Sequence, residues 1–266
     1  MPAKDPTTPG GDLLPHVVGD DGTVSIVALG GAMVTRVLAQ AEAEALENST
    51  NASTSTNTRQ FHFEVVIHPD HPRLRGLPKP PTHFHPYQEE YFTVVQGALV
   101  VEIEGVERVV RPGDGEVVIP RRANHRLCFP SLVDLGRAQQ EQGQEQEPVR
   151  FYVSGERTDT TAALDLVFFE NWYAYQEEVV VHGKRLDLIQ LLATWDAGAS
   201  CLTLPRWVPF RSSVSRALGV VVGRWLGGLL GYQPFYRAWT TDWELACARM
   251  ETSVFQRRFA DRAKTA

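Results

Sequence analysis

The sequence has few cysteines. Three occur among 266 residues, at positions 128, 201 and 247, and no two of them form a Cys-x-x-Cys pair. This small, odd number excludes a disulfide-stabilised scaffold, and the missing pair excludes a zinc knuckle. The first residues also lack the apolar stretch of a secretory signal, so we expect a reducing, cytoplasmic environment.

Positive charge is scarce as well. Lys and Arg total 26 against 32 Asp and Glu, which gives a formal net charge of −6. This balance argues against a general nucleic-acid-binding protein, whose surface normally carries an excess of basic residues. Apolar residues make up 43% of the chain, which excludes disorder throughout and is enough to form a sizeable core.

The composition divides the chain into three regions. Residues 1–23 are rich in Pro, Gly and Asp and are expected to form a flexible arm. Residues 24–170 alternate short apolar runs with Gly and Pro, and residues 171–266 show helical spacing of apolar positions. Two polar low-complexity inserts, 48–58 and 137–148, interrupt the middle region and are expected to be loops.

The middle region is typical of an all-β sandwich or barrel, because many short strands follow one another at close spacing. The expected strands are VSIVAL (24–29), MVTRVLA (33–39), FHFEVVI (61–67), THFH (82–85), YFTVV (91–95), ALVVEI (98–103), VERVV (106–110), EVVI (116–119), HRLCF (125–129), RFYV (150–153) and LDLVFF (164–169).

Four side chains in this region have the composition of a metal site. His83 and His85 are two residues apart, so on a strand they lie on the same face. Glu90 follows after four residues, and His125 opens a later strand. Imidazole and carboxylate ligands together suit iron, manganese, nickel, copper or zinc, and the sequence does not choose among them. Glu89 is the alternative carboxylate.

This pattern resembles the cupin superfamily. The first motif of that family, G-x5-H-x-H-x(3,4)-E-x6-G, matches from Gly76 to Gly97 with one extra residue in the first gap. The second, G-x5-P-x-G-x2-H-x3-N, matches from Pro120 to His125. Arg122 stands in place of the motif's glycine and Phe129 in place of its asparagine. The resemblance covers roughly residues 24–170. It implies an all-β, double-stranded β-helix (a jelly-roll or cupin barrel), here with an appended α-helical C-terminal segment.

The resemblance also implies that His83, His85, Glu90 and His125 bind one divalent transition metal per chain. Three histidines and one carboxylate leave one or two coordination positions open, as a catalytic metal requires. Glu90 is the expected catalytic residue, since a carboxylate beside a metal can also accept a proton.

Strand alternation predicts the side chains around that site. If Glu90 points inward, Phe92 and Val94 do so too, and Leu127 and Phe129 follow His125 in the same way. On the expected strand 61–67, either Phe61 and Phe63 or His62 and Glu64 face inward, and the sequence does not decide which. Such a pocket suits a hydrophobic or aromatic small molecule.

The C-terminal region carries a glycine stripe. Gly219, Gly223, Gly227 and Gly231 recur every four residues, so on a helix they form one smooth face that permits close packing. We expect this helix to pack on the barrel or across a homodimer interface. The alternative is a weak interfacial membrane contact or a hydrophobic lid formed by residues 214–232, because the run is too short and polar to span a bilayer.

Together these features predict a metal-dependent cupin oxidoreductase, dioxygenase-like, of specialised metabolism, that acts on a hydrophobic or aromatic small molecule. Two alternatives stay open. One is a non-redox lyase, cyclase, isomerase or decarboxylase, which the same ligands can serve. The other is a non-catalytic binding protein.

Overall fold

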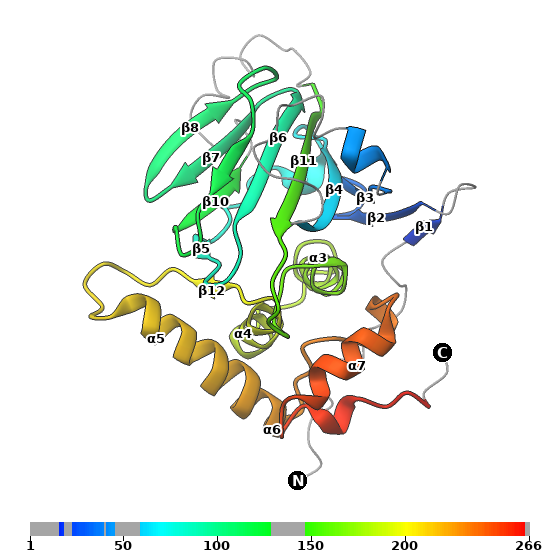
Figure 1. The fold of residues 1–266 in the computed structure, drawn as a ribbon, viewed down its shortest axis with the longest axis vertical. Helices are drawn as coiled ribbons and strands as arrows, with labels where there is room; N and C mark the ends of the chain where they lie inside the picture. Colours follow the sequence, from blue (N-terminus) through cyan, green and yellow to red (C-terminus); the bar gives the residue numbers. More distant parts are fainter. Residues whose placement is uncertain (1–15, 19–22, 40, 46–58, 129–146, 264–266) are drawn as a thin grey trace. The chain divides into compact units, whose positions relative to one another are not determined.

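The computed structural model describes residues 16–18, 23–39, 41–45, 59–128 and 147–263 (Figure 1). The chain divides into two compact units. Of the described residues, those from 16 to 84 and from 88 to 158 belong to the sheet unit, and 85–87 and 159–263 belong to the helical unit. The inserts predicted as loops lie almost wholly outside the described residues.

The sheet unit is built from two antiparallel sheets. The first has the strand order β1-β2-β3-β4-β11-β6-β9, and the second contains β5, β10, β7 and β8 as successive neighbours. The strands of the first sheet are β1 (His16–Val18), β2 (Val24–Ala28), β3 (Met33–Val37), β4 (Arg59–Ile67), β6 (Glu90–Gln96), β9 (Val117–Ile119) and β11 (Val149–Glu156). Those of the second are β5 (His83–Phe84), β7 (Leu99–Ile103), β8 (Val106–Val110) and β10 (His125–Cys128).

The strands expected from residues 24 to 153 are thus confirmed in type and order. Their core positions follow the two-residue period of a strand with one buried face. On β4, Phe61, Phe63, Val65 and Ile67 are buried, whereas the residues between them are half-buried or exposed. This decides the choice that the sequence left open, because the phenylalanine face is the core face.

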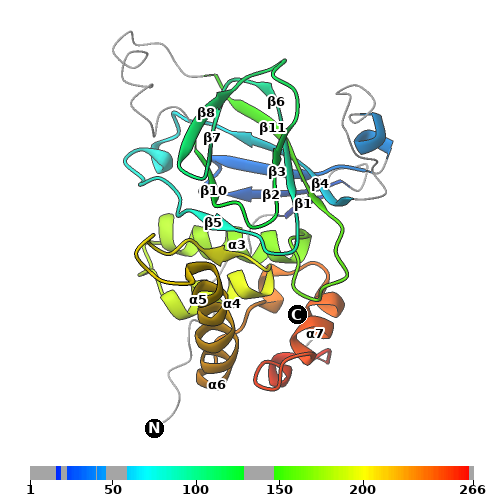
Figure 2. The same cartoon turned by 60° about the vertical axis from the view of Figure 1, so that its left-hand side comes forward.

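The helical unit consists of α3 (Leu166–Val180), α4 (Leu188–Ala197), α5 (Arg211–Leu218), η5 (Gly219–Gly227), α6 (Gly228–Leu230) and α7 (Trp243–Glu251), with the short elements β12 (Cys201–Leu202), η6 (Arg237–Trp239) and η7 (Arg257–Phe259). Figure 2 shows α5 and α6 continuing one another beside α4. The carboxylates of Asp165 and Asp187 accept backbone N–H groups at the first turns of α3 and α4, which explains where these helices begin.

Two expectations about the chain's organisation were wrong. Residues 164–169 were expected to be a closing strand, but α3 begins there, because Asp165 caps it and the short apolar run suits a buried helix equally well. The strands of the sheet unit therefore end at Glu156 and not near residue 170. Residues 16–18, inside the expected arm, pair with β2 as β1.

The glycine stripe of the C-terminal helix packs on α4 of the same chain. A Cβ atom on Gly223 would lie 2.5 Å from the carbonyl carbon of Leu192, and one on Gly227 would lie 3.1 Å from Cγ2 of Ile189. Only glycine allows such close contact between helix backbones. No helix among the described residues is long and apolar enough to cross a bilayer.

Candidate metal centre

The four side chains singled out by spacing come together in the structure. His83, His85, Glu90 and His125 each offer a ligand atom, and these atoms all lie within 4.8 Å of one another. His83 lies on β5 and His125 opens β10, and the two residues are direct partners in the antiparallel pairing of these strands. Their rings are 4.4 Å apart between centroids. Glu90 opens β6, and His85 follows β5 directly.

Three of the four side chains are buried, and the fourth, His83, is half-buried. His125, His85 and Glu90 are only 1%, 3% and 5% exposed. Nε2 of His125 lies 2.8 Å from Oε2 of Glu90. For zinc, metal–ligand bonds of about 2.0–2.2 Å place neighbouring ligand atoms roughly 3 Å apart. The spacing of this pair therefore suits two ligands of one ion.

Each histidine also has a polar partner at its other ring nitrogen. Nδ1 of His83 lies 3.3 Å from the carbonyl oxygen of Pro81, and Nδ1 of His125 lies 2.9 Å from that of Ala123. A carbonyl oxygen only accepts hydrogen bonds, so in both rings Nδ1 carries the proton and a neutral ring keeps its lone pair on Nε2. Such outer partners fix the tautomer and orientation of metal-binding histidines.

His85 also has a polar partner, which orients its ring but, being a hydroxyl that can donate or accept, does not set its tautomer. Its Nδ1 lies 3.3 Å from the hydroxyl oxygen of Ser200, which is 95% buried. Because this partner is 115 residues away in the sequence, no local spacing signals it. At His125, a neutral ring with its proton on Nδ1 turns a lone pair toward the Glu90 carboxylate. One metal ion can accept this lone pair and one from the carboxylate together, so the donor set fits a metal ion.

The alternative carboxylate is placed elsewhere. Glu89 accepts a hydrogen bond from the hydroxyl of Tyr91 at 3.0 Å, and its backbone N–H donates to Glu156 at 3.2 Å. Glu90, not Glu89, belongs to the cluster of potential metal ligands.

The turn before His125 differs in sequence from the family pattern, but the structure still forms it. Arg122, which stands at the motif's glycine position, adopts the left-handed conformation with φ of 68°. This backbone costs about 1–2 kcal/mol for a residue with a side chain. The neighbouring Asn124 donates twice to Oε1 of Glu104, both at 2.7 Å, and its carbonyl accepts the Glu104 N–H. These bonds hold the turn, and sequence reasoning missed them.

Some of the apolar residues that were predicted to face inward near the site are buried. Phe92 and Val94 are buried on the face of β6 that they share with Glu90. Leu127 on β10 is half-buried, and Phe129 lies outside the described residues. Their contact with a substrate stays a prediction.

A cavity of about 390 Å³ lies in the helical unit beside Ser200. Its polar lining includes Arg216, whose guanidinium donates to the hydroxyl of Tyr87 at 2.7 Å. Arg216 forms no ion pair with a carboxylate among the residues that the structure describes. Burial raises the pKa of the Cys201 thiol in this lining to about 12, so Cys201 is a poor nucleophile at neutral pH. A volume of this size can hold a small organic molecule.

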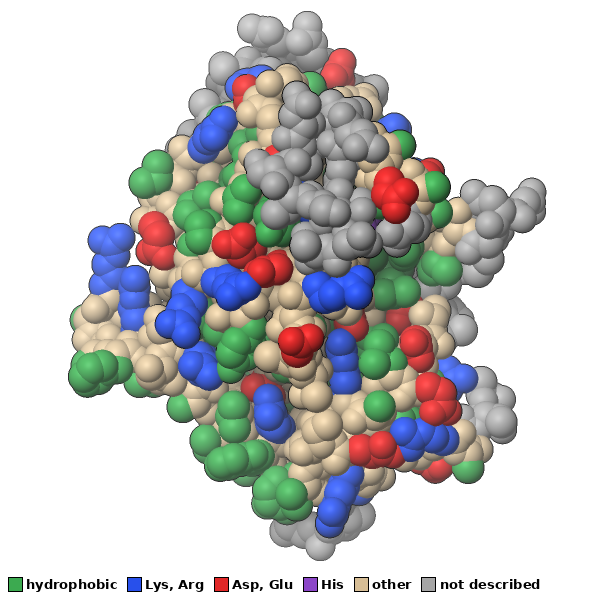
Figure 3. Space-filling view, in the orientation of Figure 1, with side chains coloured by type: hydrophobic (Ala, Val, Ile, Leu, Met, Phe, Trp, Pro, Cys, Tyr) green, Lys and Arg blue, Asp and Glu red, His purple; other side chains and the backbone are tan. Residues whose placement is uncertain are grey.

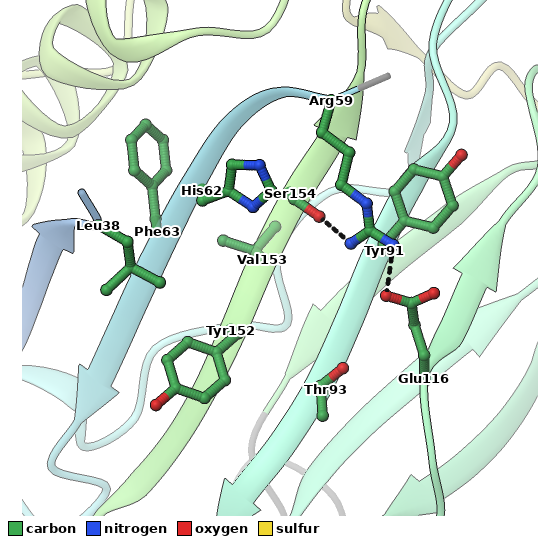
Figure 4. A pocket seen from close by; sticks show the side chains of 10 residues that line it. All are labelled: Leu38, Arg59, His62, Phe63, Tyr91, Thr93, Glu116, Tyr152, Val153 and Ser154. Atoms are coloured by element: carbon green, nitrogen blue, oxygen red, sulfur yellow. Dashed lines mark hydrogen bonds and ion pairs between the residues drawn. The ribbon is translucent and has the colours of Figure 1, made fainter. Parts of the chain in front are cut away.

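A second polar cluster lies on the sheet unit (Figure 4). The Arg59 guanidinium donates to Ser154 at 2.6 Å and to Glu116 at 2.8 Å, and it stacks 4.2 Å above the Tyr91 ring. Burial, with a smaller contribution from the charge of Arg59, lowers the pKa of the neighbouring His62 to about 4. Because the contacts of Arg59 tie several strands together, we assign this cluster a structural role.

Comparison with known proteins supports the site. A family model described as a cupin domain matches residues 75–131, which contain all four candidate ligands. The chain is 46% identical over 209 residues to a probable oxidoreductase, yanE, of Aspergillus niger, covering 77% of each chain. It is 47% identical over 211 residues to the oxidoreductase macE of Penicillium terrestre, covering 76% of this chain and 77% of the relative. It is 37% identical over 182 residues to the epoxidase atD of Aspergillus terreus, covering 68% of this chain and 53% of the relative.

Proposed function

The chain belongs to the cupin superfamily and is an oxidoreductase, and from this premise we propose a metal-dependent, dioxygenase-like reaction. In this proposal the enzyme oxidises a hydrophobic or aromatic small molecule of specialised metabolism, with molecular oxygen as the oxidant. The observation that carries it is the convergence of His83, His85, Glu90 and His125, of which the last three are buried. The fungal relatives named oxidoreductase or epoxidase support the reaction class.

A divalent transition metal bound by these four side chains would supply an open coordination position for oxygen or substrate. The protein's own contribution is to prepare the ligands. The carbonyls of Pro81 and Ala123 and the hydroxyl of Ser200 orient the rings, so little rearrangement accompanies metal binding. The burial of His85, Glu90 and His125 limits their contact with bulk water, which strengthens electrostatic interactions among them.

Glu90 has a second role in this proposal. Its Oε2 lies 2.8 Å from Nε2 of His125, so the carboxylate is placed to hold a proton released at the site. The buried Phe92 and Val94 on the same strand face provide apolar surface for the substrate. Within the helical unit, Arg216 lines the same cavity as Ser200 and can donate hydrogen bonds to oxygen atoms of a molecule bound there.

The test compares oxygen uptake by wild type, Glu90→Gln and the matched control Glu89→Gln, each loaded in turn with iron, manganese, nickel, copper or zinc. A panel of substituted phenols serves as substrate. We expect substrate-dependent oxygen uptake in wild type and Glu89→Gln, and its loss in Glu90→Gln with an unchanged circular dichroism spectrum.

Turnover of a substrate under strictly anaerobic conditions would contradict oxygen as the oxidant. If the product were an isomer or cleavage product with no net oxidation, the non-redox lyase or isomerase alternative would replace the proposal. Equal activity in Glu90→Gln and Glu89→Gln would remove Glu90 from the reaction.

A further inference from the structure

The helical unit exposes several large apolar side chains. We define the apolar face as Trp207, Phe210, Val221, Trp225, Leu229 and Leu230. Trp207 and Phe210 are 82% and 86% exposed, and the remaining four are about half exposed. Figure 3 shows hydrophobic side chains gathered at its lower left, over α5 and α6. Soluble surfaces rarely gather large exposed apolar side chains in this way without a binding role.

The glycine stripe explains why these side chains point outward. Gly219, Gly223 and Gly227 are buried against α4, where a Cβ on Gly223 would overlap the backbone of Leu192. A helix that must place its glycines inward places its bulky residues on the opposite side. The apolar face is therefore a consequence of how this helix packs.

The charge around the apolar face is mainly positive, although Arg224 forms an ion pair with Asp196 of α4 at 2.6 Å. Residues 197–241 contain five arginines and no Asp, Glu or Lys, although the whole chain has a net charge of −6. Arg206 adjoins Trp207 and is exposed, and Arg216 and Arg224 lie on the helix itself. Exposed aromatic rings combined with arginines are the pattern of helices that lie in the interface of anionic lipid bilayers.

A groove of about 410 Å³ extends this surface. It is lined by Arg224 and Trp225 of η5 and by Val254 and Phe255 from the segment after α7. The Arg258 guanidinium donates to the backbone carbonyl of Leu229 at 2.9 Å. The apolar walls of the groove suit an acyl chain.

We propose that the apolar face docks the protein onto an anionic phospholipid surface, with α5, η5 and α6 lying in the plane of the interface. The helix would insert Trp207, Phe210 and Trp225 among the headgroups while the exposed Arg206 contacts a lipid phosphate. This inference is independent of the proposed reaction. It depends only on the exposed side chains and charge of the helical unit.

The test is co-sedimentation of the full chain with vesicles of phosphatidylcholine alone and of phosphatidylcholine mixed with phosphatidylserine. We expect wild type to pellet with the anionic vesicles, less so at high salt, and not with neutral ones. The double variant Trp225→Ser/Leu229→Ser should weaken binding by about tenfold or more. Arg206→Gln should weaken it by about fivefold, as for one arginine at an anionic surface.

Val106→Ser is the matched control, because Val106 is 71% exposed but lies on β8 of the sheet unit. It should pellet like wild type. The proposal is overturned if wild type stays in the supernatant, if it binds both vesicle types equally, or if Val106→Ser loses as much binding as the double variant. A dimer in light scattering that the double variant converts to monomer, without vesicle binding, would assign the face to a second copy instead.

Discussion

Replacing Gly223 by alanine tests the helix packing most sharply. The added Cβ would lie 2.5 Å from the carbonyl carbon and oxygen of Leu192 and 2.8 Å from the backbone nitrogen of Ala193. These atoms belong to the backbone of α4 and cannot rotate away, so the helix must shift. Such overpacking typically costs about 1–3 kcal/mol, which the better helix propensity of alanine offsets by up to about 1 kcal/mol.

Gly219→Ala is the matched control on the same stripe. Its nearest contact would be an ordinary 3.4 Å to the Asp196 side chain, so the propensity gain should remain and the variant should be about as stable as wild type or slightly more. We therefore expect Gly223→Ala to be about 2 kcal/mol less stable than Gly219→Ala. Urea denaturation followed by circular dichroism at the helical band measures this difference. Equal stabilities of the two variants would refute the packing described here.

Three further predictions concern the site and its surroundings. Ser200→Ala should raise the dissociation constant of the metal about tenfold or more, measured by chelator competition, with Ser212→Ala unchanged. Arg216→Gln should raise KM for oxygen-bearing substrates with little change in kcat. The control Arg206→Gln, at an exposed position, should leave KM unchanged. A fall in kcat without a rise in KM would contradict a binding role for Arg216. His62 has a folded pKa of about 4, below its usual 6.5. The unfolded chain therefore takes up its proton first as the pH falls. The contribution of His62 to stability is present above pH 6.5 and decreases between pH 6.5 and 4, so His62→Asn should show a smaller decrease of the urea midpoint over this range, and an identical decrease would count against the shifted pKa.

The ligand set was predictable in part from local spacing and in part from the family resemblance. Two histidines two residues apart on a strand share a face. The choice of Glu90 over Glu89 and the addition of His125 were implied by the resemblance to the cupin motifs. The structure confirms the convergence of these residues with His125. The identity of the bound metal stays a prediction.

The supporting contacts were not predictable in the same way. Ser200 meets His85 only because the chain returns after 115 residues, and nothing in its local sequence marks it. The strand expected at 164–169 was wrong because short apolar runs suit a buried strand and a buried helix equally, and Asp165 provides the cap that decides for the helix. The glycine stripe was read correctly as a packing face, but its partner is α4 and not the barrel.

The most direct test of a metal-dependent oxidoreductase is the metal content of the full chain. Plasma mass spectrometry should compare wild type with His83→Ala/His125→Ala, prepared identically and checked by circular dichroism. We predict about one transition metal ion per wild-type chain and none in the double variant, with both proteins folded. Wild type that stays metal-free after reconstitution, or a folded double variant that keeps its metal, would contradict the account.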